Sequence, residues 1–212
     1  YFIENQILFF SSNVMIKSMH DSLIQYIQKY SSTPLSADAI EGIKNSFVPK
    51  KLRKKQYFLQ EGEVCKYFAF IVKGAMRQYT VDEKGVEHIV QLSIENWWVG
   101  DRESWVMLTP SNYNIDAWED TELLLIKRAD TLFLTTHCST FNEMVRVRDE
   151  RNNIAAQKRI TSSISFTAEK RYADFVYSYP DFLQRFPQHL IASYLGITKH
   201  TLSRVRKQPL KK

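Results

Sequence analysis

Short apolar segments separated by turn residues dominate residues 56–127. Six of these segments are rich in aromatic and β-branched side chains: QYFLQ, KYFAFIV, AMRQYTV, EHIVQLS, NYNIDAWE and TELLLIK. Turn signals such as Glu61-Gly62, Lys73-Gly74 and Thr109-Pro110 separate them. This pattern is typical of short strands joined by tight turns. It predicts a small β-sandwich or β-roll.

Helical patterns flank the strand region. Two short helices are predicted over 20–30 and 36–47, and after Thr140 no glycine or proline occurs until Pro180. The sequence TFNE at Thr140 fits a capping box, so a helix of about 25 residues is predicted there. Because polar residues interrupt its apolar stripe, we expect this helix to pack on its own domain or to pair with a second copy.

The stretch QHLIASYLGITKHTLSRVRK, residues 188–207, fits a helix-turn-helix. Two crossing helices would share a core of Ile191, Leu195, Ile197, Leu202 and Val205. Ala192 lies where the helices approach most closely, and Gly196 lies where the turn requires a positive φ angle. Thr198 is the predicted N-cap of the second helix.

Positive charge is concentrated at the C-terminal end. Residues 145–212 contain 14 Lys and Arg against 5 Asp and Glu, whereas residues 1–144 contain 15 against 18. A basic module usually binds a polyanion. Lys199 and His200 occupy the first turn of the second helix, where the helix dipole disfavours cations, so a role beyond packing is indicated. The predicted contacts to DNA are Thr198, Lys199, His200, Thr201, Ser203, Arg204, Arg206 and Lys207.

Among these contacts, Arg204 is expected to read a base, and Arg206 and Lys207 are expected to hold phosphates. The earlier basic run KKLRKK, residues 50–55, has two interpretations, a solvated strand edge or a nucleic-acid contact. We favour the solvated edge because the run opens the strand region.

Two motifs carry a resemblance to a known family. ITKHTLSRVRK is similar to the recognition helix, and EGEVCKYFAFIVKGAMRQY to the first strands, of the Crp/Fnr family of bacterial transcription factors. The resemblance implies an α+β fold with an N-terminal β-roll (jelly-roll-like, cyclic-nucleotide-binding type), a long dimerisation helix and a C-terminal winged helix-turn-helix. The predicted domains are an extension and helical lead-in (1–49), the sensor roll (50–136), the long helix (137–166) and the DNA-binding domain (167–212).

The resemblance also implies partners. A homodimer would bind palindromic double-stranded DNA through two recognition helices about 34 Å apart. An effector bound in each roll would reorient the DNA-binding heads, and RNA polymerase is a further candidate partner. His200 replaces a glutamate that is common in the family, so the operator sequence should differ.

The predicted effector pocket departs from the family pattern. Members that bind cyclic AMP carry a Gly-Glu pair and, further on, an Arg-Ser pair that binds the phosphate. Gly100-Asp101 takes the first place here, and Ser111-Asn112 takes the second without an arginine. A buried phosphate without a cation is costly, so we expect an unknown small ligand or none, and not cyclic AMP. The candidate pocket residues are Trp98, Gly100, Asp101, Arg102, Ser111 and Asn112.

Several other classes of protein and site are disfavoured. Cys65 and Cys138 cannot supply the four ligands of an iron-sulfur cluster, and their number fits a reducing cytoplasm. The five histidines are scattered, so no metal site is predicted. No catalytic motif is present, and we predict no enzyme.

The four tryptophans are predicted to fill the core of the roll rather than stack on a ligand. No apolar run reaches bilayer length, and residues 1–18 are assigned no function.

Two alternatives remain open at this level. The chain is either a DNA-binding regulator or a ligand-binding β-roll module whose basic C-terminal tail contacts a protein or RNA. Within the first class, the regulator either responds to an effector or has lost it and responds only to its own concentration.

Overall fold

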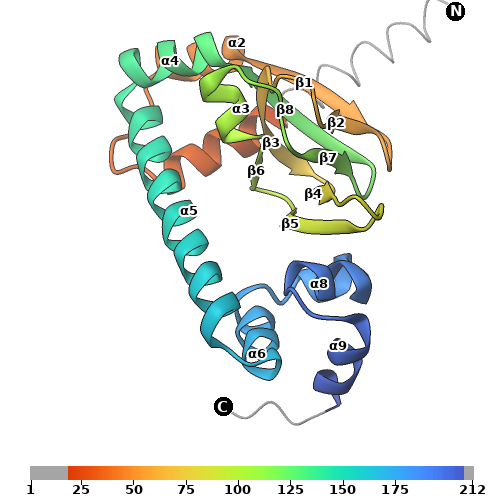
Figure 1. Ribbon diagram of the computed structural model, residues 1–212. Coiled ribbons are helices and arrows are strands. Elements are labelled where there is room, and N and C mark those ends of the chain that lie inside the picture. The colour runs from red at the N-terminus through yellow and green to blue at the C-terminus, as the bar shows by residue number, and fades with distance from the viewer. Residues whose placement is uncertain (1–18, 208–212) are drawn as a thin grey trace, which may run out of the picture. The chain divides into compact units, whose positions relative to one another are not determined.

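The computed structural model describes residues 19–207, and the chain divides into two compact units (Figure 1). The first unit contains the described residues up to Met76 together with Ser93–Arg148. The second unit contains Arg77–Leu92 and the residues from Asp149 onward.

The strand region forms two four-stranded sheets, with strand orders β1-β8-β3-β6 and β2-β7-β4-β5. The strand pairs β1–β8, β3–β8, β3–β6 and β2–β7 are antiparallel. The predicted β-roll is therefore confirmed. The strands are β1 (Phe47–Leu52), β2 (Tyr57–Leu59), β3 (Tyr67–Lys73), β4 (Met76–Val81), β5 (Glu87–Ser93), β6 (Trp98–Val99), β7 (Asn114–Ala117) and β8 (Thr121–Lys127).

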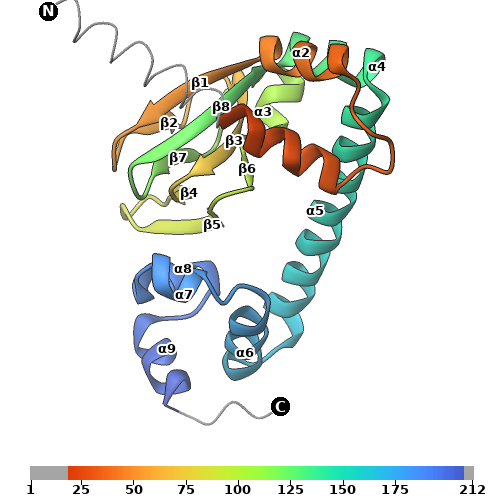
Figure 2. The ribbon, with the colours of Figure 1, turned by 180° about the vertical axis from the view of Figure 1, so that it is seen from behind.

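Strand β3 is apolar on both faces because both faces are covered. Successive side chains of a strand point to opposite sides. Ala69 and Ile71 lie in the core inside the roll, whereas Phe70 lies in a second core with Leu23 and Ile27 of the N-terminal helix. Figure 2 shows that helix, residues 19–29, lying against the sheet that contains β3 and β8.

The two lead-in helices were predicted correctly. Residues 19–29 are helical, and α2 spans Ala37–Ser46. The Ser36 hydroxyl caps α2 by accepting a hydrogen bond from the Ala39 amide at 3.1 Å. Polar residues with a hydroxyl are favoured at this position because they satisfy an amide that lacks a partner within the helix.

Five elements were missed from the sequence: β1, β6, α3 (Arg102–Met107), α4 (Arg128–His137) and α7 (Phe182–Arg185). The return to helix was placed at Thr140, but α4 already follows β8 directly. Strand β1 contains part of the basic run, and its exposed Lys51 forms an ion pair with the half-buried Glu122 at 3.1 Å. A charged strand edge of this kind agrees with the favoured interpretation of the run.

The long helix α5 spans Ser139–Ser165, but the predicted capping box is wrong. Thr140 is buried within the first turn, and the Glu143 carboxylate accepts hydrogen bonds from the amide and hydroxyl of Ser32, both at 2.9 Å. Because the helix begins at Ser139, Thr140 is not its N-cap. The Glu143 side chain instead makes a tertiary contact with Ser32. These hydrogen bonds hold the pKa of Glu143 below its ordinary value.

After α5, the described residues of the second unit form only helices and the links between them. It contains α6 (Ala168–Ser178), α7 (Phe182–Arg185), α8 (Gln188–Tyr194) and α9 (Lys199–Arg206). The sequence AEKRYADFVYSY predicts a helix that starts at the capping residue Thr167, and in the structure Thr167 caps α6 by accepting a hydrogen bond from the Lys170 amide. Between Ala168 and Lys207 no strand is present, so the predicted wing is not among the described residues. The links between these helices are too short to form a hairpin.

Among residues 19–207, no helix has the length and apolarity needed to cross a bilayer.

Candidate DNA-binding surface and effector pocket

Helices α8 and α9 share the predicted apolar core. Of the predicted core residues, Ile191, Leu202 and Val205 are each at most 3% exposed, as is Ala192, whereas Leu195 and Ile197 are only half-buried. Gly196 in the turn has a φ angle of 64°, which favours glycine because a Cβ atom would be strained there. This part of the chain therefore forms the predicted helix-turn-helix.

The N-cap of α9 is also as predicted. The Thr198 Oγ1 atom accepts a hydrogen bond from the Thr201 amide at 3.1 Å. Thr201 is half-buried because its side chain turns back toward this cap at 2.9 Å. A cap of this type is worth about 1 kcal/mol to the helix. It fixes the end of α9 at which the predicted DNA contacts begin.

The remaining predicted DNA contacts lie on the exposed face of α9. Buried residues at 202 and 205 fix the opposite face, so the residues between them project outward. Arg204 forms an exposed ion pair with Glu169 of α6, with 3.3 Å between Nη2 and Oε1. Exposed pairs of this kind are weak, so Arg204 remains available to a stronger anionic partner. The exposed predicted residues are Thr198, Lys199, His200, Ser203, Arg204, Arg206 and Lys207.

The predicted effector residues do not converge on one open pocket. Asp101 and Ser111 are brought together, but they bind each other: the Ser111 hydroxyl donates to Asp101 Oδ2 at 2.8 Å. Asp101 also caps α3 by accepting from the amides of Glu103 and Ser104. Both residues are at most 4% exposed. A ligand hydroxyl would therefore have to displace an existing buried hydrogen bond.

The other candidate residues lie elsewhere. Trp98 packs on Phe70 with ring centroids 5.4 Å apart, which places it in the core, whereas Asn112 is exposed. Trp98 and Arg102 line a small cavity together with Trp105 and Arg148. Its volume of about 20 Å³ accommodates roughly one water molecule and no nucleotide. Gly100 directly precedes the capping Asp101 and lies against the Phe68 ring, which a Cβ atom at this position would approach to 3.0 Å.

Cys65 is a buried thiol of the roll. It is 1% exposed, and burial raises the pKa of its thiol to about 11. Because the thiolate is the nucleophile, we expect alkylation of Cys65 in the folded protein at pH 8 to be at least about 100-fold slower than in the unfolded chain. Mass spectrometry of iodoacetamide-treated protein, with and without urea, measures this. Equal labelling in both states would show that the thiol is not enclosed.

Within the described residues, no group of three or more His, Cys, Asp or Glu side chains is placed to hold a metal ion.

Sequence reasoning missed two arginines that hold the end of α8. Arg159 of α5 donates from Nη2 to the Tyr194 carbonyl at 3.2 Å, and Arg171 of α6 donates from Nη1 to the Leu195 carbonyl at 2.9 Å. Cations stabilise the C-terminal end of a helix because its carbonyls are partly negative. No local sequence pattern points to these hydrogen bonds, because the partners are 35 and 24 residues apart along the chain.

Comparisons with known proteins show which domain family and which solved structures this chain resembles. Residues 49–137 match the family model of the cyclic nucleotide-binding domain. FixK2 from Bradyrhizobium japonicum is similar in structure, with a TM-score of 0.66, 21% identity, and coverage of 76% of this chain and 83% of FixK2. A comparison with curated protein sequences found no significant match.

Two further structures have the same fold. The Thermus thermophilus catabolite activator protein gives a TM-score of 0.51 at 19% identity, covering 81% of this chain and 82% of that one. A protein from Eubacterium rectale, described as a transcriptional regulator of the Crp/Fnr family, gives 0.60 at 15% identity, covering 81% and 82%. Residues 49–137 are therefore similar to a cyclic nucleotide-binding domain, and the chain shares the fold of these solved structures, as the predicted resemblance to the Crp/Fnr family implies.

Proposed function

We propose that this chain is a sequence-specific, DNA-binding transcription regulator that acts as a homodimer. The observation that carries the proposal is the recognition helix α9, whose buried face is apolar and whose exposed face carries Lys199, His200, Arg204 and Arg206. A helix N-terminus with cations and hydroxyl groups, and with no acidic residue in its first turn, fits the edges and phosphates of a major groove. In this proposal residues 50–136 are the sensor roll, 137–166 the dimerisation helix and 167–212 the DNA-binding domain.

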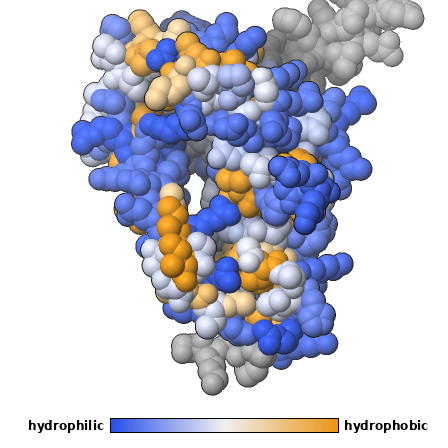
Figure 3. All heavy atoms as spheres, in the orientation of Figure 1, coloured by the Kyte–Doolittle hydropathy of each residue, from blue (hydrophilic) through white to orange (hydrophobic). Residues whose placement is uncertain are grey.

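The exposed half of α5 supports the dimer. Ile154, Ile160 and Ile164 are 49%, 59% and 78% exposed, and the buried residues of α5 all lie in its first two turns. Figure 3 shows hydrophobic surface along α5. A single long helix with few contacts is marginal in water, and pairing with a second copy would cover these side chains. Sedimentation of a monomer at micromolar concentration would contradict the dimer.

The roll is proposed to be a sensor that does not use cyclic AMP. Asp101 and Ser111 already satisfy each other, and the positions that would hold the cyclic phosphate offer no arginine. An unidentified small effector, or none, is compatible with this site.

Selection of bound sequences from a random duplex pool tests the proposed function. Purified full-length protein is incubated at near-physiological salt, with and without cyclic AMP. We expect enrichment of a palindrome with half-sites one helical turn apart, in both conditions. Enrichment only in the presence of cyclic AMP would overturn the proposal that the roll does not use cyclic AMP. No enrichment, together with capture of an RNA or protein, would favour the alternative of a ligand-binding module with a basic contact tail.

Lys207→Ala tests the phosphate contacts. Lys207 is exposed at the C-terminal end of α9, so its loss should weaken binding to all duplexes about equally. We expect the slope of log affinity against log salt concentration to fall by about 1. Fluorescence anisotropy on the selected palindrome and on a scrambled duplex, over a range of salt, measures both effects. A loss confined to the palindrome would identify Lys207 as a base contact.

A further inference from the structure

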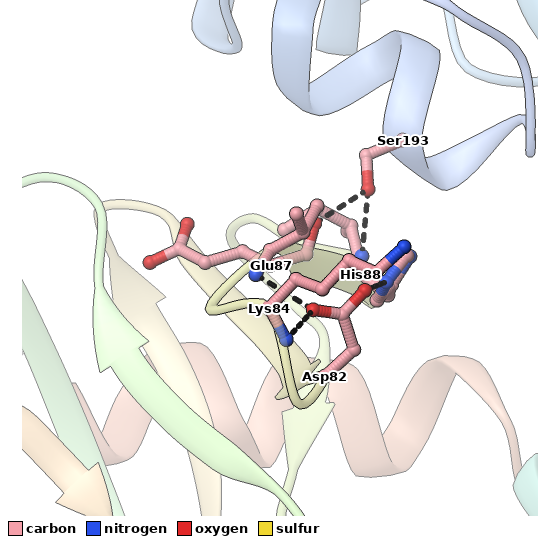
Figure 4. A network of polar contacts seen from close by, with 7 residues as sticks. Asp82, Lys84, Glu87, His88 and Ser193 are labelled. Atoms are coloured by element: carbon pink, nitrogen blue, oxygen red, sulfur yellow. Dashed lines mark hydrogen bonds and ion pairs between the residues drawn. The ribbon is translucent and has the colours of Figure 1, made fainter.

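Ser193 of α8 binds the edge of strand β5 within the second unit. Its hydroxyl accepts a hydrogen bond from the Ile89 amide at 2.9 Å and donates to the Glu87 carbonyl at 3.2 Å (Figure 4). Strand β5 is the last strand in its sheet order. The backbone groups of residues 87 and 89 lie on the same edge, where a further strand would otherwise pair. The Ser193 side chain therefore takes the place of that strand.

Arg159 strengthens the same junction. Its Nη2 atom donates to the carbonyls of Ile89, at 3.1 Å, and Tyr194, at 3.2 Å, and its Nη1 atom donates to the Val90 carbonyl. The guanidinium carbon lies 4.3 Å from the centre of the Tyr194 ring. One side chain of α5 thus joins β5 to the end of α8. We call Ser193, Arg159 and the β5 backbone of residues 87–90 the β5–α8 clasp.

The hairpin that presents this edge is itself fixed. Asp82 Oδ1 accepts from the amides of Lys84 and Val86, both at 2.9 Å, and Oδ2 pairs with His88 Nε2 at 2.9 Å (Figure 4). An aspartate that binds the backbone two residues on is a common device for ordering a turn. These contacts order the β4–β5 hairpin, so the edge of β5 that binds Ser193 is held in a fixed position.

We infer that Ser193 and Arg159 are positioning residues for the recognition helix, and that the β4–β5 hairpin is a structural part of the DNA-binding unit. The inference rests on the proposed function. None of the clasp hydrogen bonds uses a predicted DNA contact, so the exposed face of α9 stays open while α8 is held. A recognition helix held in place loses less freedom on binding. In a dimer, this smaller loss of freedom has its largest effect on a palindrome, because both DNA-binding domains must bind half-sites at a fixed spacing.

The test compares Ser193→Ala with wild type in the full chain. We expect amide exchange at Ile89 to become at least about tenfold faster, because its acceptor is lost. Affinity for the palindrome should fall by about fivefold and affinity for a single half-site by less than about twofold. The salt slope should not change, because no phosphate contact is removed.

Matched variants separate positioning from general destabilisation. Ser193→Thr keeps the hydroxyl and should restore most of the affinity, whereas Ser178→Ala removes an exposed serine of α6 and should change nothing. Arg159→Lys keeps the charge but not the forked donor, so it should act like Ser193→Ala with an unchanged salt slope.

Three results would overturn the inference. Unchanged exchange at Ile89 in Ser193→Ala would show that the clasp does not form. Faster exchange with an unchanged or higher ratio of palindrome to half-site affinity would show that the clasp does not position α9. If the wild type selects no DNA, the proposed function fails and the positioning role with it, while protection of Ile89 still reports whether the clasp exists.

Discussion

Gly74→Ala is expected to destabilise the β-roll by about 2 to 5 kcal/mol. Gly74 has a φ angle of 103°, and a Cβ atom there would lie 2.6 Å from the Asp120 carbonyl oxygen and 2.8 Å from Thr121 Cα. Backbone atoms cannot move aside as a flexible side chain can. The substitution would therefore separate the β3–β4 turn from the start of β8.

Urea unfolding followed by tryptophan fluorescence measures this loss, because all four tryptophans lie between residues 97 and 118. Gly85→Ala is the matched control. Gly85 also has a positive φ angle, 77°, but a Cβ atom there would meet nothing within 4 Å. It should cost only the conformational strain, about 1 to 2 kcal/mol. Equal losses in the two variants would show that the contact with residues 120 and 121 is unimportant.

Arg204→Ala is expected to weaken binding to the selected palindrome by about 1 to 3 kcal/mol, or roughly 5- to 150-fold. Arg204 projects from the exposed face of α9 one turn after His200, and a guanidinium can bind guanine through two hydrogen bonds. Preference at one base position per half-site should be lost. Anisotropy on the palindrome and on its single-base variants measures both effects.

Glu169→Gln is the control for the ion pair of Arg204. The pair is exposed on both sides, so removing the carboxylate charge should change the free energy of unfolding by less than about 1 kcal/mol. Affinity for DNA should stay the same or rise slightly, because a competing anion is removed. Full affinity in Arg204→Ala, with base preference intact, would mean that α9 does not present Arg204 to DNA.

Local patterns predicted the elements that depend on local chemistry. Thr198 and Thr167 cap their helices, and Gly196 adopts the positive φ angle, because these requirements involve residues only a few positions apart. The same reasoning failed at Glu143, which had a plausible local partner but binds Ser32, 111 residues away along the chain. It also missed α4, which has neither a capping side chain nor a clean apolar stripe.

The sequence by itself determined the β-roll, the long helix, the helix-turn-helix and the residues on the exposed face of α9, because periodicity, turn residues and caps act over short distances. Only the tertiary structure decided which partners the polar groups find. It pairs Asp101 with Ser111 instead of leaving them open to a ligand, and it joins Ser193 and Arg159 to strand β5. Hydrogen bonds of this kind depend on where the fold brings distant segments together, and a buried polar group binds whichever partner it meets there.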